Sequence, residues 1–253
     1  MMKKRNLRLT VEYDGTPFYG WQIQKNQKTV QGEIQKAVEK IIGKRVVIAG
    51  AGRTDAGVHA LGQVANFHTT SKLSCRKWVL ALNSHLPEEI SILEVEEVPL
   101  EFHSQFDAHE KTYRYSILNR PARSAVRNNF THLVKPPLDV KLMAQGAHHL
   151  VGTHDYRSFG SDMSKKKKTV RTIRTFDVRK VDDEIHFTVT GDGFLYNQVR
   201  AMVGSLLLVG SGSQTPAWIR KVLVAKDRQK AGPNVHARGL MLVEVLYPVP
   251  GKS

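Results

Sequence analysis

The sequence predicts an α+β protein made of two ferredoxin-like halves, each with the order β-α-β-β-α-β. Segments in which apolar and polar residues alternate are interleaved with segments whose apolar residues recur every three or four positions. This order occurs twice along the 253 residues, and the change from one half to the next falls near residues 106–111. We therefore expect one half at 1–107 and the other at 108–253. Together they would form an extended antiparallel sheet with helices on one side and a basic cleft on the other.

The elements of the first half follow from their hydrophobic periods. Val30, Ile34 and Val38 recur at helical spacing, and Thr29 before them is suited to cap a helix N-terminus. In chain order we expect a strand at 7–13, a helix at 30–42, strands at 46–49 and 63–68, a helix at 76–84 and a strand at 90–98.

The second half repeats this order with an insertion. Val199, Met202 and Leu206 share one side of its most apolar helix. In chain order we expect a strand at 112–118, a helix at 140–150, strands at 170–181 and 184–190, a helix at 195–208, a short helix at 217–224 and a strand at 239–247.

The charge of the chain points to a polyanionic partner. Lysine and arginine number 38 against 23 aspartates and glutamates, which gives a net charge of +15 and a pI near 9.9. A surplus of this size is typical of proteins that neutralise phosphates and release counterions. An acidic membrane surface is the competing interpretation, but no amphipathic Lys/Trp helix or lipidation motif favours it. A basic protein with no polyanionic partner is the remaining alternative.

Cysteine usage and hydropathy exclude several classes of protein. Cys75 is the single cysteine, so the chain has no internal disulfide and no zinc site built from several thiolates. One free thiol fits a reducing compartment, and we expect a cytoplasmic location. The basic N-terminus is followed at 7–13 by alternation with charges, which is unlike a signal peptide. No run of about 18 apolar residues predicts a transmembrane helix.

The loop between the strands 46–49 and 63–68 has more polar chemistry than a turn requires. It reads Gly50-Ala51-Gly52-Arg53-Thr54-Asp55-Ala56-Gly57-Val58-His59. Glycines allow positive φ angles or a close approach of the backbone to a ligand. Asp55 is the natural candidate for a reacting group, and Arg53 and His59 are candidate contacts to substrate. An ordinary surface or core histidine is the equal alternative for His59.

This loop does not fit the common nucleotide-binding motifs. A dinucleotide fingerprint needs G-x-G-x-x-G at the start of a helix, whereas Asp55 stands at the third glycine position and a strand follows. The chain has neither a G-x-x-x-x-G-K-[ST] loop nor the zinc deaminase signature. A nucleotide-dependent oxidoreductase is therefore disfavoured.

Two segments are candidates for contact with nucleic acid, each with a structural alternative. The first could stack on an unpaired base or place its phenylalanines in the core, and it comprises Phe102, His103, Ser104, Gln105 and Phe106. The second is the densest positive run, which contacts phosphates or is merely solvated, and it comprises Ser164, Lys165, Lys166, Lys167 and Lys168.

The second half supplies possible partners for Asp55. Tyr113 and Tyr115 alternate on one strand and so face the same way. Arg200 lies in the first turns of an apolar helix, where an arginine is costly unless a carboxylate pairs with it. Asp55 needs such a partner if it is to remain ionised within a pocket.

The motifs together resemble the tRNA pseudouridine synthase A family along nearly the whole chain. The loop Gly52-Arg53-Thr54-Asp55-Ala56-Gly57-Val58-His59 resembles the active-site motif of that family. Further matching segments, in order, are Tyr13-Asp14-Gly15-Thr16, Phe18-Tyr19-Gly20-Trp21-Gln22, Thr29-Val30-Gln31, Lys111-Thr112-Tyr113-Arg114-Tyr115, Asn197-Gln198-Val199-Arg200 and Ala225-Lys226-Asp227-Arg228. The chain departs at Gly239-Leu240-Met241-Leu242, where the family usually has an aromatic residue, and in the lysine content of its basic run.

This resemblance implies a function and roles for particular residues. It implies isomerisation of uridine to pseudouridine in the tRNA anticodon stem-loop, at positions 38, 39 and 40, by a cytoplasmic homodimer with no metal or organic cofactor. Asp55 would be the nucleophile, Arg200 would pair with it, and Tyr113 would stack on the target base. The two candidate segments would contact tRNA in a basic RNA-binding cleft. A non-catalytic tRNA-binding protein or chaperone of the same fold is the alternative.

Overall fold

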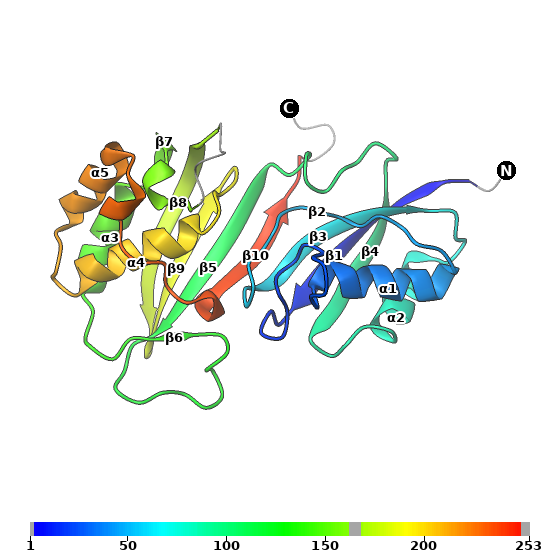
Figure 1. Ribbon diagram of the computed structural model, residues 1–253, viewed down its shortest axis with the longest axis horizontal. Helices are drawn as coiled ribbons and strands as arrows, with labels where there is room; N and C mark the ends of the chain where they lie inside the picture. The colour runs from blue at the N-terminus through cyan, green and yellow to red at the C-terminus, as the bar shows by residue number, and fades with distance from the viewer. Residues whose placement is uncertain (1–2, 162–167, 249–253) are drawn as a thin grey trace. The chain divides into compact units, whose positions relative to one another are not determined.

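The computed structural model describes residues 3–161 and 168–248 and divides the chain into two compact units (Figure 1). The first unit runs to His109 and includes the chain from Leu242, and the second runs from Glu110 to Met241. The predicted α+β class is confirmed, because each unit combines antiparallel strands with packed helices.

The first unit is built on the strand order β4-β1-β3. β1 (Arg5–Tyr13) pairs antiparallel with β3 (His59–Thr69) and with β4 (Ile90–Val98), and the two-residue β2 (Ala49–Gly50) pairs with β3. Alternate residues of β1 are fully buried, namely Leu7, Leu9, Val11 and Tyr13. The end of β10 (Leu240–Leu246) lies beside β3, which explains why the chain from Leu242 groups with the first unit.

Two capped helices cover the apolar face of these strands. α1 (Val30–Ile42) begins at Thr29, whose side chain accepts from the Gly32 amide, and ends at Gly43 in the left-handed region. α2 (Cys75–Asn83) begins at Ser74, and its Trp78 packs edge-on against Phe67 of β3 at 5.3 Å. The opposite face carries a polar network in which the amide groups of Asn6 and Asn66 donate to the Phe102 carbonyl. This network fixes the segment 99–107 over the sheet.

The second unit has the strand order β5-β9-β8-β7. Its strands are β5 (Glu110–Leu118), β9 (Glu184–Gly191), β8 (Val170–Val181) and β7 (Gly152–Asp155), with β6 (His132–Leu133) parallel to β5. Its helices are α3 (Val140–His148), α4 (Gln198–Gly210) and α5 (Pro216–Ala225), which contact one another, and short 3₁₀ turns occur at Arg157–Phe159, Arg228–Lys230 and Ala237–Gly239. The core of this unit lies between these helices and strands β5, β8 and β9.

Most element boundaries differ from the sequence prediction by a few residues, and two of these differences have a local explanation. The strand expected at 46–49 is reduced to Ala49–Gly50, with Val47 exposed and Ile48 buried, so alternation there reflects a partly buried loop. The helix expected from residue 195 begins at Gln198, because Asn197 has φ 61 and cannot continue a right-handed helix.

The described residues contain no helix that is both long and apolar enough to span a bilayer.

Candidate active site

The loop that carries Asp55 is held by the segment that follows β1. The Tyr13 and Thr54 hydroxyls share a hydrogen bond of 2.8 Å, and the Trp21 amide donates to the Thr54 carbonyl at 3.1 Å. The Val58 amide closes a turn by donating to the Asp55 carbonyl at 3.1 Å. Asp55 itself is partly exposed at the tip of this turn. The backbone is thus anchored at Thr54 and at Val58, and Asp55 lies half-buried between these two points.

Two glycines of the holding segment allow it to approach the loop this closely. A Cβ on Gly15 would lie 1.9 Å from the Val58 carbonyl oxygen. Gly20 has φ +84, and a Cβ there would lie 2.4 Å from the Thr54 carbonyl oxygen. Side chains at either position would displace the backbone that flanks Asp55.

Burial of Tyr13 raises the pKa of its hydroxyl well above the usual value. The group is therefore a neutral hydrogen-bonding partner of Thr54 at physiological pH. This supports a positioning role for Tyr13 rather than an acid–base role.

Arg53 and His59 lie in different environments within the loop. Arg53 is exposed, and its Nε donates to the Gln22 side chain at 3.2 Å. His59 is 1% exposed, and its Nδ1 accepts from the Gly15 amide at 3.0 Å. The same nitrogen lies 3.1 Å from the Asp14 carboxylate, to which an Nδ1–H would donate, so His59 contacts the turn at Asp14 and Gly15 in either tautomer. His59 therefore fixes the Asp14 turn against β3.

The second unit places Tyr113 at the edge of its core. Tyr113 on β5 is 8% exposed and meets the Phe194 ring edge-on, with centroids 5.3 Å apart. Phe194 belongs to the loop between β9 and α4, which also precedes Arg200. An aromatic wall of this kind can hold a planar base on one side.

Arg200 in the first turn of α4 is oriented by two contacts within its own unit. Its Nε donates to the Val235 carbonyl at 2.7 Å, and its Nη1 donates to the Asn197 side chain at 2.8 Å. The carbonyl of the neighbouring His236 accepts from the Tyr115 hydroxyl at 2.7 Å, which links the segment around Val235 to β5. These contacts fix the plane of the guanidinium group.

The sequence did not predict the supporting roles of Asn197, Val235 and Phe194. An asparagine just before a helix is a recognisable N-cap signal, but here its side chain binds Arg200 and makes no capping bond. The left-handed conformation of Asn197 directs the side chain toward Arg200, and that conformation is not readable from sequence.

The aromatic segment 102–106 divides into buried anchors and an exposed pair. The Ser104 side chain is fully buried, donates to the Ala49 carbonyl at 2.8 Å and therefore holds the segment to the sheet. Phe102 packs against Tyr247 at 5.0 Å, with the Arg8 guanidinium over both rings. The centroids of the His103 and Phe106 rings lie 4.3 Å apart. Phe106 is 76% exposed, and Gln105 is exposed as well. The exposed pair is the part that can meet a base.

Most of the predicted basic run falls outside the described residues. Ser164, Lys165, Lys166 and Lys167 are in that interval, while Lys168 is described and exposed. Downstream, Arg171 donates to the Lys168 and Val170 carbonyls, and Arg174 forms an ion pair with Glu110.

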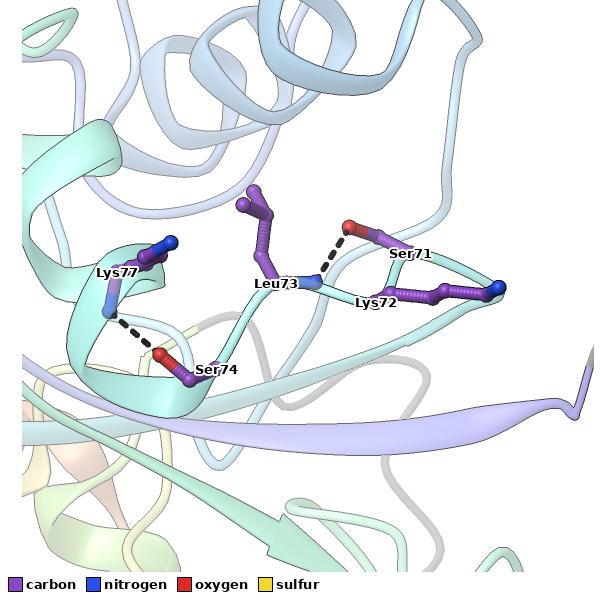
Figure 2. Close-up of a pocket in the computed structure, with 5 residues that line it drawn as sticks. All are labelled: Ser71, Lys72, Leu73, Ser74 and Lys77. Atoms are coloured by element: carbon purple, nitrogen blue, oxygen red, sulfur yellow. Dashed lines mark hydrogen bonds between the residues drawn. The ribbon is translucent and has the colours of Figure 1, made fainter.

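A shallow pocket of about 370 Å³ lies at the start of α2, and none of the predicted site residues lines it (Figure 2). It is lined by Ser71, Lys72, Leu73, Ser74 and Lys77. Ser71 accepts from the Leu73 amide and Ser74 accepts from the Lys77 amide, so both hydroxyls complete local turns. Among residues 3–161 and 168–248, no three histidine, cysteine or acidic side chains gather in a way that could hold a metal ion.

A family model and two relatives with the same kind of name match most of this chain. Residues 9–107 and 147–248 match the family model described as tRNA pseudouridine synthase. The tRNA pseudouridine synthase A of Brevibacillus brevis is 47% identical over 243 residues, which covers 96% of this chain and 100% of the relative. The tRNA pseudouridine synthase A 2 of Clostridium tetani is 49% identical over 245 residues, which covers 96% and 99%. Among solved structures, a chain of a Cbf5-Nop10-Gar1 complex matches with 11% identity and a TM-score of 0.36, over 93% of this chain and 57% of that one.

Proposed function

The chain belongs to the tRNA pseudouridine synthase family and isomerises uridine to pseudouridine in tRNA, and from this we propose that its targets are uridines 38, 39 and 40 of the anticodon stem-loop. The relatives that share 46–49% of its residues are named tRNA pseudouridine synthase A. The +15 net charge supports a large polyanionic substrate.

The observation that carries the proposed mechanism is the Asp55 loop, whose backbone is anchored on both sides of one half-buried aspartate. In our proposal Asp55 is the nucleophile of an isomerisation that is balanced without a co-reactant. The N1–C1′ bond breaks and a C5–C1′ bond forms, while a proton leaves C5 and N1 gains one. A carboxylate can form and release a covalent adduct in such a sequence. The target base must leave its stack, since these atoms are out of reach in a helix.

The second unit would complete this site. We propose that Arg200 pairs with Asp55 and keeps it ionised, since a fixed guanidinium favours a carboxylate over a carboxylic acid. Tyr113 would stack on the detached base, supported by Phe194 behind it. Arg53, His59 and the exposed His103–Phe106 pair would lie on the substrate side, with His59 acting through the Asp14 turn.

Mapping the product positions tests the proposed substrate. The protein is incubated with unmodified tRNA transcripts and no cofactor, and pseudouridines are located at single-nucleotide resolution. Pseudouridine confined to positions 38–40 is the expected result. Modification elsewhere would reassign the substrate, and binding without any modification would favour the tRNA-binding or chaperone alternative.

We propose further that the protein acts as a cytoplasmic homodimer, which rests on the family resemblance. Light scattering of the purified chain should give twice the monomer mass of 28.5 kDa. A monomer at the concentrations used for catalysis would exclude this assembly.

Changing Tyr113 to phenylalanine should separate base stacking from proton transfer. The ring and its contact with Phe194 are retained, so tRNA affinity should change by less than about threefold. If the hydroxyl moves a proton, the single-turnover rate should fall about 100-fold. Tyr156→Phe is the matched control, because it removes buried hydrogen bonds to the Leu150 and Gly152 carbonyls away from the proposed chemistry. An unchanged rate in Tyr113→Phe would make its hydroxyl dispensable.

Replacing Lys165, Lys166, Lys167 and Lys168 together by alanine should weaken tRNA binding and flatten its dependence on salt. Each lysine that neutralises one phosphate contributes about 0.9 to the slope of log affinity against log salt for duplex. The measurement is tRNA affinity between low and moderate salt. A slope equal to that of the unmodified protein would mean that these lysines are only solvated.

A further inference from the structure

The strand that carries Tyr113 has a half-buried lysine, Lys111, as its second residue. Lys111 and Tyr113 are two residues apart on β5, so both side chains leave the same face of the strand. Lys111 is paired in register with Gly191, at the end of β9. The backbone of Lys111 therefore lies beside the end of β9, from which the chain continues through Phe194 to α4.

Arg171 reaches the same loop from β8. A Cβ on Gly193 would lie 3.7 Å from Arg171 Nε, so the arginine side chain passes over the backbone of this loop. The positive charge of Arg171 also acts on Lys111. Burial first, and Arg171 second, lower the pKa of the Lys111 ammonium. Two cations from β5 and β8 thus share one side of the β9–α4 loop.

Among residues 3–161 and 168–248, no ion pair joins a carboxylate to Lys111 or to Arg171. Within that part, Lys111 makes no hydrogen bond or ion pair, and the Arg171 guanidinium donates to the Lys168 and Val170 carbonyls at 3.3 and 2.7 Å. Of the acidic neighbours, Glu110 pairs with Arg174, and Asp192 accepts from the Thr172 amide at 3.0 Å and keeps its charge without an ion pair to either cation. A partly desolvated cation beside another is unfavourable until an anion joins them.

The spacing along β5 suits an anion that is covalently linked to a base. Side chains two residues apart on one strand face are separated by about 7 Å. A base stacked on Tyr113 would bring its own sugar–phosphate backbone within reach of a long lysine side chain at that distance. Phosphate oxygens are the acceptors that lysine and arginine bind most readily in RNA.

We propose that Lys111 and Arg171 form a subsite for a single phosphodiester of the RNA, adjacent to the nucleotide whose base Tyr113 holds. The identity of that nucleotide rests on the proposed function. The subsite anchors the backbone while the base is turned, so it positions the substrate and takes no part in bond making.

The test measures whether the effect on RNA affinity of neutralising one phosphate depends on the presence of Lys111. Stem-loop RNAs, of the sequence that product mapping identifies as substrate, carry a neutral methylphosphonate at one linkage at a time around the target. Their affinities are measured for the wild-type protein and for Lys111→Met, Lys111→Arg and Arg171→Met. Arg179→Met is the matched control on β8, because that side chain is 77% exposed and distant in sequence from the loop.

One linkage should cost the wild-type protein about tenfold in affinity when neutralised. Lys111→Met should bind the unmodified RNA about tenfold more weakly and lose nothing further at that linkage, whereas Lys111→Arg and Arg179→Met should keep the wild-type sensitivity. Arg171→Met should reduce the sensitivity at the same linkage. Additive losses for Lys111→Met at every linkage would overturn the subsite, whether or not the variant folds less stably.

The two proposals fail in different ways. Product mapping with the wild-type protein decides which uridines are modified and does not depend on Lys111. The coupling measurement decides whether a phosphodiester meets Lys111, and it uses whichever stem-loop the mapping has identified.

Discussion

Replacing Asp55 by asparagine is expected to abolish pseudouridine formation and to leave tRNA binding almost unchanged. An amide has nearly the shape of the carboxylate but cannot attack carbon or carry the negative charge that the proposed mechanism requires. Loss of a catalytic nucleophile commonly lowers turnover by 10⁴-fold or more. The rate is measured in single turnover with saturating enzyme, and affinity is measured on the same tRNA.

A charge control makes this result specific. Asp177→Asn removes one negative charge from an exposed position on β8, so any general gain in RNA affinity appears there as well. The loop should keep its conformation in Asp55→Asn, because Thr54 and Val58 are held through Tyr13, Trp21 and the Asp55 main-chain carbonyl. Substantial pseudouridine formation by Asp55→Asn would refute the assignment of Asp55.

Replacing Gly20 by alanine is expected to disturb the active site through the backbone alone. Gly20 has φ +84, which strains any L-residue by roughly 1–2 kcal/mol. Its new Cβ would also lie 2.4 Å from the Thr54 carbonyl oxygen and 3.0 Å from the Asp55 carbonyl carbon, so the loop must move. A displacement of about 1 Å in a catalytic group can cost about 100-fold in rate, and we expect kcat to fall by that order.

Gly43→Ala separates strain from displacement. Gly43 ends α1 with φ +72, and a Cβ there would meet nothing within 4 Å. Both variants should lose similar stability from strain, measured by chemical denaturation, but only Gly20→Ala should lose activity. Equal activity in the two variants would show that the fit of Gly20 against Thr54 does not set the position of Asp55.

The sequence was sufficient where local rules dominate. The helix expected at about 30–42 spans Val30–Ile42, because its apolar spacing and the Thr29 cap agree. The α+β class and the family followed from the order of elements and motifs, and both are confirmed. Asp55 stood out because its loop combines a carboxylate, an arginine and a histidine among glycines, which is more polar chemistry than a turn requires.

Predictions were less complete where distant segments meet. The sequence could not show that Ser104 is a buried anchor whereas Phe106, two residues later, is exposed. It placed His59 only as a neighbour of Asp55, while the fold buries it against the Gly15 amide. Hydrophobic period assigns a face to a residue in a strand or helix, but gives no such assignment in a loop.

The sequence by itself determined the fold class, the family and the residue types available for the chemistry. The tertiary structure decided which backbone holds each of them: the Tyr13 to Trp21 segment for Asp55, and Asn197 with Val235 for Arg200. The physical reason is that periodicity and capping act over a few residues. The left-handed turn at Asn197 and the close approach of Gly20 to Thr54 arise only when segments far apart in the chain pack together.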